Sequence, residues 1–132
     1  MKSMKVGLLG LGVVGGGTWN VLRRNAQEIT RRAGRQIEVV CVAVRDVAKA
    51  RARIGEDVCI TDDPYEIVND PNIDIVVELI GGITTAKALV MSAIENGKHV
   101  VTANKALLAT HGTEIFEAAS AKGVMVAFEG AV

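Results

Sequence analysis

Several features that would place this chain in a special class are scarce or missing. Aromatic residues make up 3% of the 132 residues, prolines and cysteines number two each, and 15 basic residues balance 15 acidic ones. Two cysteines are too few for a disulfide framework, and a formal net charge of +0 gives no overall positive field for nucleic acid. No apolar run approaches a membrane span and no signal-peptide stretch is seen. We therefore expect a cytoplasmic protein without nucleic-acid or membrane partners.

What the chain has is a regular alternation of apolar and amphipathic segments. Hydrophobic residues make up 49%, enough for one domain over residues 1–132. We expect strands at 5–9, 37–44, 58–60, 73–80, 99–102 and 124–129. We expect helices at 14–33, 47–54, 64–69, 86–96, 106–110 and 113–122. Six alternations predict an α/β fold with a doubly wound, mostly parallel six-stranded sheet and helices on both faces. Right-handed crossovers then place the first and fourth strands side by side.

Capping residues set the expected helix ends. Asp63 followed by Pro64 predicts a helix start, and Gly123 predicts a helix stop. Thr84 and Thr85 are expected to cap the helix over 86–96, and Gly112 to interrupt the last helical stretch.

A glycine-rich turn follows the first expected strand. Gly10-Leu11-Gly12-Val13-Val14-Gly15 fits the fingerprint G-x-G-x-x-G between a strand and a helix. Gly10 can take a backbone conformation that side chains forbid, Gly12 leaves room for a pyrophosphate, and Gly15 lets the helix sit close to the strand. The free N–H groups of the helix start favour the diphosphate charge. We interpret the turn as a Rossmann-type dinucleotide site, the alternative being a tight turn that binds nothing.

Two residues of opposite charge follow the second strand. An acidic residue there binds the ribose 2′-OH of NAD, whereas an arginine pairs with the 2′-phosphate of NADP. This chain has Arg45 and then Asp46, so NADP is favoured and NAD stays open. The alternatives are that Asp46 caps the next helix and that Arg45 is a solvated strand end.

Other candidates follow later strands. Gly81 and Gly82 come after the fourth strand and would admit the nicotinamide half of a dinucleotide. Lys105 follows the fifth strand. It either contacts a cofactor phosphate, a ribose or a bound carboxylate, or it is an exposed first-turn lysine. The carboxyl ends of parallel strands share one edge, so these segments converge on the glycine turn.

The remaining titratable residues are interpreted as structural. Glu78 lies within an apolar run and must find hydrogen-bond donors, which favours a satisfied structural carboxylate over a catalytic one. His99 and His111 lack metal-ligand spacing and a nucleophile partner, and His99 is expected to be structural. Cys41 and Cys59 fit buried thiols of a reducing compartment.

Taken together, these segments resemble homoserine dehydrogenase. The combination of Glu78 to Gly82 with Thr102 to Leu108 is its most specific part. The full set of matching stretches is Val6-Gly7-Leu8-Leu9-Gly10-Leu11-Gly12-Val13-Val14-Gly15, Val42-Ala43-Val44-Arg45-Asp46, Val76-Val77-Glu78-Leu79-Ile80-Gly81-Gly82, His99-Val100-Val101-Thr102-Ala103-Asn104-Lys105-Ala106-Leu107-Leu108-Ala109 and Phe128-Glu129-Gly130-Ala131-Val132.

The resemblance implies a reaction and residue roles. The reaction is reversible NAD(P)-dependent reduction of L-aspartate 4-semialdehyde to L-homoserine, in threonine and methionine biosynthesis. Residues Gly10 to Gly15 would bind the cofactor diphosphate, Arg45 the 2′-phosphate, and Lys105 would lie against the cofactor. Glu129 and Val132 match positions that help hold a monovalent cation, usually sodium. The full-length enzyme would be a homo-oligomer.

The chain also departs from the family. Thr85 stands where proline is common, and we expect no functional loss from it. The family continues beyond the position of Val132 into a substrate and dimerisation region with the catalytic lysine. We therefore expect a fragment without catalytic residues, inactive alone. The alternatives are a stand-alone dinucleotide-binding sensor module and the first domain of a different amino-acid or semialdehyde oxidoreductase.

Overall fold

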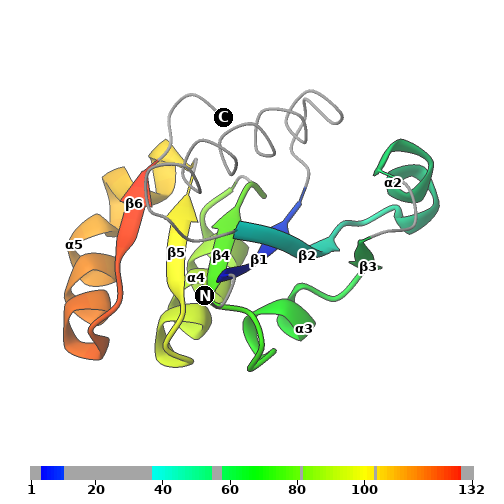
Figure 1. The fold of residues 1–132 in the computed structure, drawn as a ribbon. Coiled ribbons are helices and arrows are strands. Elements are labelled where there is room, and N and C mark those ends of the chain that lie inside the picture. The colour runs from blue at the N-terminus through cyan, green and yellow to red at the C-terminus, as the bar shows by residue number, and fades with distance from the viewer. Residues whose placement is uncertain (1–3, 11–36, 55–57, 81, 103, 129–132) are drawn as a thin grey trace.

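Six strands form one parallel sheet in the order β3-β2-β1-β4-β5-β6 (Figure 1). The computed structural model describes residues 4–10, 37–54, 58–80, 82–102 and 104–128. The strands are β1 (Met4–Leu9), β2 (Ile37–Ala43), β3 (Cys59–Thr61), β4 (Ile75–Glu78), β5 (His99–Thr102) and β6 (Val126–Phe128). Every neighbouring pair is parallel. The predicted adjacency of the first and fourth strands is confirmed, because β1 pairs with β4.

Helices lie on both faces of this sheet. They are α2 (Val47–Ile54), α3 (Pro64–Val68), α4 (Thr84–Glu95) and α5 (Lys105–Lys122). One face packs against α3, α4 and α5 in a core that includes Ile67, Leu89 and Ile115. A smaller cluster on the other face includes Ala50 of α2. The predicted doubly wound α/β fold is therefore confirmed, while the helix expected over 14–33 lies outside the described residues.

A glycine inside β1 lets α3 approach the sheet. A Cβ built on Gly7 would lie 2.4 Å from Cγ2 of Ile67, a fully buried residue of α3. No real side chain tolerates that distance without a shift of its neighbour. Gly7 therefore serves packing, although it stands next to the glycine-rich turn in sequence.

Two expected helix ends are confirmed. Asp63 caps α3, where its Oδ1 accepts a hydrogen bond from the Tyr65 N–H at 3.0 Å, and Pro64 takes the first helical position. Gly123 ends α5 with φ +72°, a left-handed conformation that glycine adopts without a steric penalty.

Two other expectations about helix ends are wrong. The helix α5 runs unbroken through Gly112, because Leu107, Ile115 and Ala119 bury one stripe along it and outweigh the roughly 1 kcal/mol that a helical glycine costs. Thr84 and Thr85 are exposed and lie inside α4. The N-cap position is Ile83, which makes no side-chain cap and packs instead against the core.

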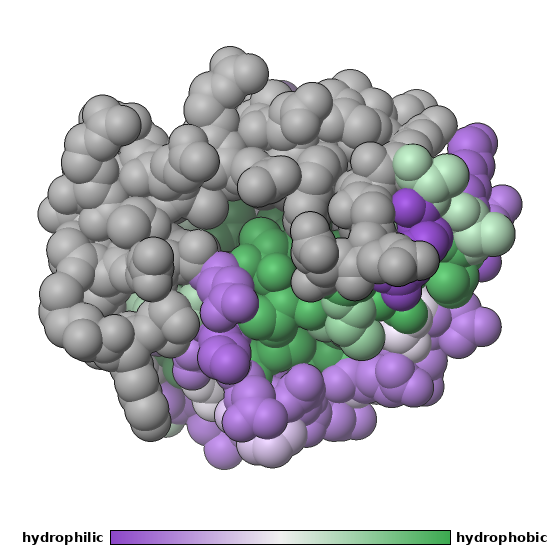
Figure 2. Space-filling view, turned by 45° about the vertical axis from the view of Figure 1, so that its right-hand side comes forward, coloured by the Kyte–Doolittle hydropathy of each residue, from purple (hydrophilic) through white to green (hydrophobic). Residues whose placement is uncertain are grey.

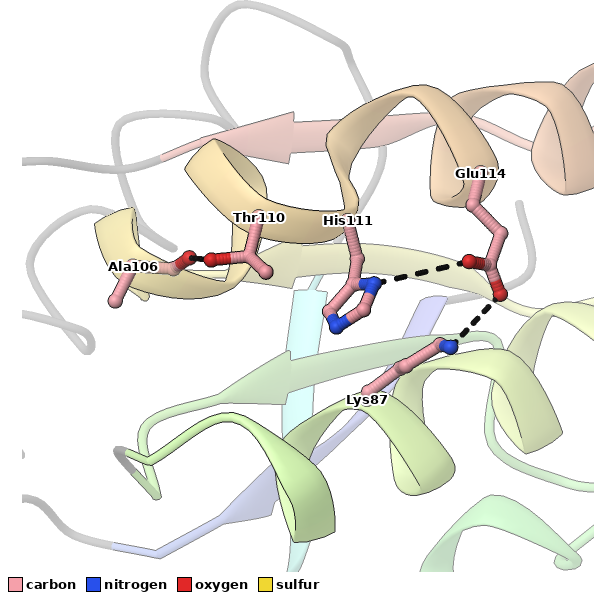
Figure 3. A network of polar contacts seen from close by, with 5 residues as sticks. All are labelled: Lys87, Ala106, Thr110, His111 and Glu114. Carbon is pink, nitrogen blue, oxygen red and sulfur yellow. Dashed lines mark hydrogen bonds and ion pairs between the residues drawn. The ribbon is translucent and has the colours of Figure 1, made fainter.

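An ion pair joins the two long helices (Figure 3). Lys87 of α4 reaches Glu114 of α5, with 2.9 Å between Nζ and Oε2, and His111 Nδ1 lies 3.7 Å from Oε1 of the same carboxylate. One turn earlier, the Thr110 hydroxyl donates to the carbonyl of Ala106 at 2.8 Å. The hydrogen bond from Lys87 lowers the pKa of Glu114. The side chains are partly exposed, so the pair adds little stability.

The two cysteines face each other across β2 and β3. Cys41 is directly opposite Cys59 in the strand register, and both thiols are free. Cys41 is buried as expected, and burial followed by the hydrogen bond with Cys59 raises its pKa to about 12. The expectation of burial is wrong for Cys59, which is exposed because β3 is the outermost strand.

On one face of the molecule, the visible apolar side chains lie together. Figure 2 shows the apolar side chains gathered in the middle of this view and the polar ones mostly at its lower and outer margins.

Within the described ranges, no helix combines the length and the apolar character that crossing a membrane requires.

Candidate functional site

The predicted site residues that the structure describes all lie at one edge of the sheet. Gly10 follows β1, Arg45 follows β2, Gly82 follows β4 and Lys105 follows β5. These four strands are neighbours in the order β2-β1-β4-β5, so their carboxyl ends form a continuous edge (Figure 1). The other predicted site residues lie outside the described residues: Leu11, Gly12, Val13, Val14, Gly15, Gly81, Glu129 and Val132.

Gly10 closes the end of β1 in a conformation that requires glycine. Its φ is +86°, and its N–H donates to the carbonyl of Ala43 at 2.7 Å. A Cβ at this position would lie in ordinary contact with the carbonyl oxygen of Leu79, at 3.5 Å. The positive φ, however, would strain the backbone of any residue with a side chain. This is the geometry expected of the first glycine in a dinucleotide turn.

The two charged residues after β2 have different roles. Asp46 caps α2, because its Oδ1 accepts a hydrogen bond from the Lys49 N–H at 3.0 Å. The helix-cap interpretation of Asp46 is therefore confirmed. Arg45 is exposed and makes no hydrogen bond or ion pair with the described residues. The guanidinium is thus the charged group at the β2 tip that the described structure leaves without a partner.

Beyond β4, a buried carboxylate precedes an open turn. Glu78 is fully buried, and its two oxygens accept hydrogen bonds from the Ile80 N–H and the Thr102 hydroxyl, each at 2.7 Å. The interpretation of Glu78 as a satisfied structural carboxylate is confirmed. Gly82 has φ +79° and is exposed, with nothing within 4 Å of the position of a Cβ. The turn after β4 therefore leaves open space at Gly82.

The start of α5 depends on the residue before Lys105, which was not predicted as a helix cap. Asn104 caps this helix, with its Oδ1 accepting from the Leu107 N–H at 2.9 Å, and its Nδ2 donates to the carbonyl of Gly82 at 2.5 Å. An asparagine one position before a helical stretch is a recognised cap signal, so the sequence did contain a hint. The contact with Gly82 had none, because it joins residues 22 positions apart.

Lys105 occupies the first helical position of α5 and is exposed. It has no hydrogen bond or ion pair with any described residue. A cation is unfavourable beside the positive end of a helix dipole, and the first turn of α5 holds no acidic residue. Lysine therefore does not serve the helix here. Lys105 and the N-terminus of α5 together form a positively charged site that favours a phosphate or another anion.

The described edge fits a dinucleotide in three respects. It has a positive-φ glycine at the switch point between β1 and β4, an unpaired arginine at the β2 tip, and an open glycine turn next to an unpaired lysine. Ligands of doubly wound sheets bind outside the carboxyl ends of the strands at this point.

The histidines lie away from the carboxyl edge or pair elsewhere. His99 begins β5 at the opposite edge, and its Nδ1 accepts from the Met125 N–H at 3.1 Å, which confirms the structural interpretation. His111 faces Glu114. Among the described residues, no group of three His, Cys, Asp or Glu side chains could hold a metal ion.

Comparison with known proteins agrees with this geometry. A family model described as the NAD-binding domain of homoserine dehydrogenase matches residues 10–129. The chain is 61% identical to a homoserine dehydrogenase of Pseudomonas aeruginosa over 132 residues, which is all of this chain and 30% of that protein. A homoserine dehydrogenase of Neisseria gonorrhoeae is 52% identical over the whole chain and 30% of its own length.

A solved structure shows the same arrangement. The crystal structure of a homoserine dehydrogenase from Thiobacillus denitrificans matches with a TM-score of 0.88 and 66% identity, covering all of this chain and 30% of that one. The chain thus spans about 30% of the length of the relatives it matches. From the family model, which covers most of the sequence, it follows that this chain belongs to the NAD-binding domain family of homoserine dehydrogenase and that its ligand is a nicotinamide dinucleotide.

Proposed function

We propose that residues 1–132 form one NAD(P)-binding domain that holds NADP in preference to NAD. The observation that supports this preference is the difference between Asp46 and Arg45, the two charged residues after β2. Asp46 already caps α2 through one oxygen, whereas Arg45 is exposed and lacks a partner among the described residues. A guanidinium can pair with a 2′-phosphate through two parallel hydrogen bonds. NADH lacks that phosphate and gains nothing from Arg45.

The remaining cofactor contacts follow from the order of the strands. With the adenosine 2′-phosphate at the β2 tip, the diphosphate lies at the turn that Gly10 begins, through Leu11, Gly12, Val13, Val14 and Gly15. The nicotinamide half then extends over the ends of β4 and β5, between the turn of Gly81 and Gly82 and the first turn of α5. There Lys105 contributes a positive charge beside the cofactor.

The reaction proposed for the whole protein is the interconversion of L-aspartate 4-semialdehyde and L-homoserine, on the way to threonine and methionine. The cofactor supplies or accepts the hydride. The support is membership of the family and the names of the relatives. Because those relatives are about three times as long, we propose that this chain binds the cofactor without turning over substrate.

Two further proposals rest on the family resemblance. Glu129 and Val132 would contribute a carboxylate and a main-chain carbonyl to a monovalent-cation site for sodium in the full-length protein. That protein would assemble as a homo-oligomer in the cytoplasm.

Calorimetric titration with NADPH and with NADH tests the cofactor proposal. We expect NADPH to bind more tightly, and Arg45→Gln to weaken NADPH about 10- to 100-fold while changing NADH less than about twofold, as expected for a lost charge-assisted pair. Lys122→Gln is the matched control, because it removes an exposed positive charge at the far end of α5. Equal losses for both cofactors would remove the 2′-phosphate role. Turnover of L-homoserine by the 132-residue chain would contradict the proposed inactivity.

A further inference from the structure

A chain of hydrogen bonds joins the ends of β4 and β5 under the proposed nicotinamide position. The Thr102 hydroxyl donates to Oε2 of Glu78 at 2.7 Å and accepts from the Asn104 N–H at 3.0 Å. Glu78 and Thr102 are directly opposite each other in the β4–β5 register, and both are fully buried. The fixed carboxylate therefore orients the Thr102 hydroxyl, which in turn holds the backbone of Asn104.

The side chain of Asn104 continues this chain in two directions. Its Oδ1 accepts from the Leu107 N–H inside the first turn of α5, and its Nδ2 donates to the Gly82 carbonyl in the turn after β4. An acceptor faces an N–H and a donor faces a carbonyl, so the amide orientation is settled by both partners. Asn104 is also nearly fully buried, at 9% exposure.

One planar amide thus connects two of the segments assigned to the cofactor. Lys105, next to Asn104 in the chain, starts α5, while Gly82 has a positive φ and nothing within 4 Å of the position of a Cβ. The carbonyl of Gly82 accepts from the Asn104 amide, and this hydrogen bond ties the turn after β4 to the start of α5. We propose that Asn104 is a positioning residue that sets the separation between the Gly82 turn and the first turn of α5, and so shapes the place for the nicotinamide half of the ligand. This inference rests on the proposed cofactor function.

The two roles of Asn104 can be separated by substitution. Serine and aspartate both supply an oxygen that caps a helix. Neither supplies the amide N–H that reaches Gly82, and aspartate has no donor when ionised. Asn104→Ser and Asn104→Asp therefore keep the cap of α5 and remove the link to Gly82. Asn104→Ala removes both.

A matched control lies at the opposite edge of the sheet. Asn96 follows α4, and its Nδ2 donates to the Val68 carbonyl at 2.7 Å and to Asn69 Oδ1 at 3.0 Å. Like Asn104, it links two segments far apart in sequence through a side-chain amide. Asn96→Ser removes a similar link away from the cofactor edge.

The experiment compares two ligands that share the adenosine half. Dissociation constants are measured for NADPH and for 2′-phospho-ADP-ribose, which lacks the nicotinamide, with the 132-residue chain and each variant. We expect Asn104→Ser and Asn104→Asp to weaken NADPH about tenfold, as follows if the untied turn takes the binding-competent position in about a tenth of the molecules, and to change 2′-phospho-ADP-ribose less than about twofold. Asn96→Ser should change neither. Melting temperatures should fall for Asn104→Ala more than for Asn104→Ser.

Each outcome separates this inference from the proposed function. Equal losses for both ligands, or none for NADPH, would overturn the positioning role while leaving cofactor binding intact. Equal affinity of the unmodified chain for both ligands would overturn it as well, because the nicotinamide half would then not be held. Failure of the unmodified chain to bind either ligand would overturn the proposed function and this inference with it.

Discussion

The two edges of the parallel sheet are built in different ways. At the amino edge, polar groups find partners inside the protein. Lys98 is 3% exposed, and its Nζ donates to the carbonyls of Asp70 and of Ile73, at 2.5 and 2.7 Å. Asp74 accepts from the Lys5 N–H at 2.9 Å, and Asn96 joins the end of α4 to the end of α3. This edge is closed by its own hydrogen bonds.

At the carboxyl edge, two charged side chains, the Cβ side of one glycine and the start of one helix lack such partners among the described residues. Arg45 and Lys105 are exposed without partners among the described residues, Gly82 has empty space around its Cβ position, and α4 begins without a side-chain cap. Each of these choices forgoes local stability that a cap or a pair would give. The amino edge therefore contributes to the stability of the fold, whereas the carboxyl edge gives up some stability and leaves room for a ligand.

The largest expected effect on stability comes from Lys98→Met. The substitution leaves the carbonyl of Ile73 without a donor and leaves the carbonyl of Asp70 with the Ile73 N–H alone, which should cost about 1–3 kcal/mol of unfolding free energy. Denaturant titration measures this loss. Affinity for NADPH should stay within about twofold, because Lys98 lies at the amino edge. A loss of affinity at unchanged stability would erase the distinction between the edges.

The contribution of Lys98 to the free energy of unfolding also depends on pH. Burial lowers the pKa of Lys98 below its ordinary 10.5, so the folded protein holds fewer protons on this group than the unfolded chain in the alkaline range just below that value. Stability due to Lys98 therefore increases as the pH rises through that range. The gap in unfolding free energy between the unmodified protein and Lys98→Met should widen from neutral pH toward pH 10.

Gly10→Ala is expected to lower both stability and binding. A φ of +86° costs a residue with a side chain about 1–2 kcal/mol. Any relaxation of the backbone would also move the turn where the diphosphate lies. Denaturant titration should show the first effect and NADPH titration a weaker affinity. Gly97→Ala, at φ +76° on the amino edge, should show the first effect without the second.

Lys105→Ala should weaken NADPH by about 5- to 20-fold through loss of one charge contact near a helix start. It should leave the melting temperature unchanged or slightly raised, because a cation is removed from the positive end of α5. Lys122→Ala is the control at the other end of the same helix. A marked loss of stability with Lys105→Ala would show that the lysine serves the fold.

The smallest effect concerns the bridge between α4 and α5. The hydrogen bond from Lys87 lowers the pKa of Glu114 from 4.5, so the stability it gives is present above that value and is lost as the pH falls through the folded pKa. The small difference in melting temperature between the unmodified protein and Glu114→Gln should vanish in acid. A difference that persists at pH 2 would mean that the charge of Glu114 is not its source.

The comparison of the edges also shows what the sequence could reveal. The adjacency of β1 and β4 followed from the alternation of strands and helices. The residues of the carboxyl edge followed from local patterns, because each glycine or charge comes shortly after an apolar strand. The ends set by Asp63 and Gly123 were equally local. Long-range contacts were not predictable in this way. The burial of Lys98, the steric need for Gly7 and the link from Asn104 to Gly82 all join segments far apart in the chain.

Local rules failed where packing competed with them. Gly112 signals a break, but the buried stripe of α5 carries the helix through it. Thr84 and Thr85 signal a cap, but contact of Ile83 with the core places the helix start earlier. Cys59 was expected to be buried, but its strand forms the sheet margin.

The most direct test of the contrast between the edges is a map of amide chemical shifts during titration with NADPH. The account predicts that the amides of Gly10, Arg45, Gly82 and Lys105 shift, while those of Asp74, Gly97, Lys98 and Met125 at the amino edge stay in place. Shifts concentrated at the amino edge, or none at the carboxyl edge at saturating NADPH, would contradict it.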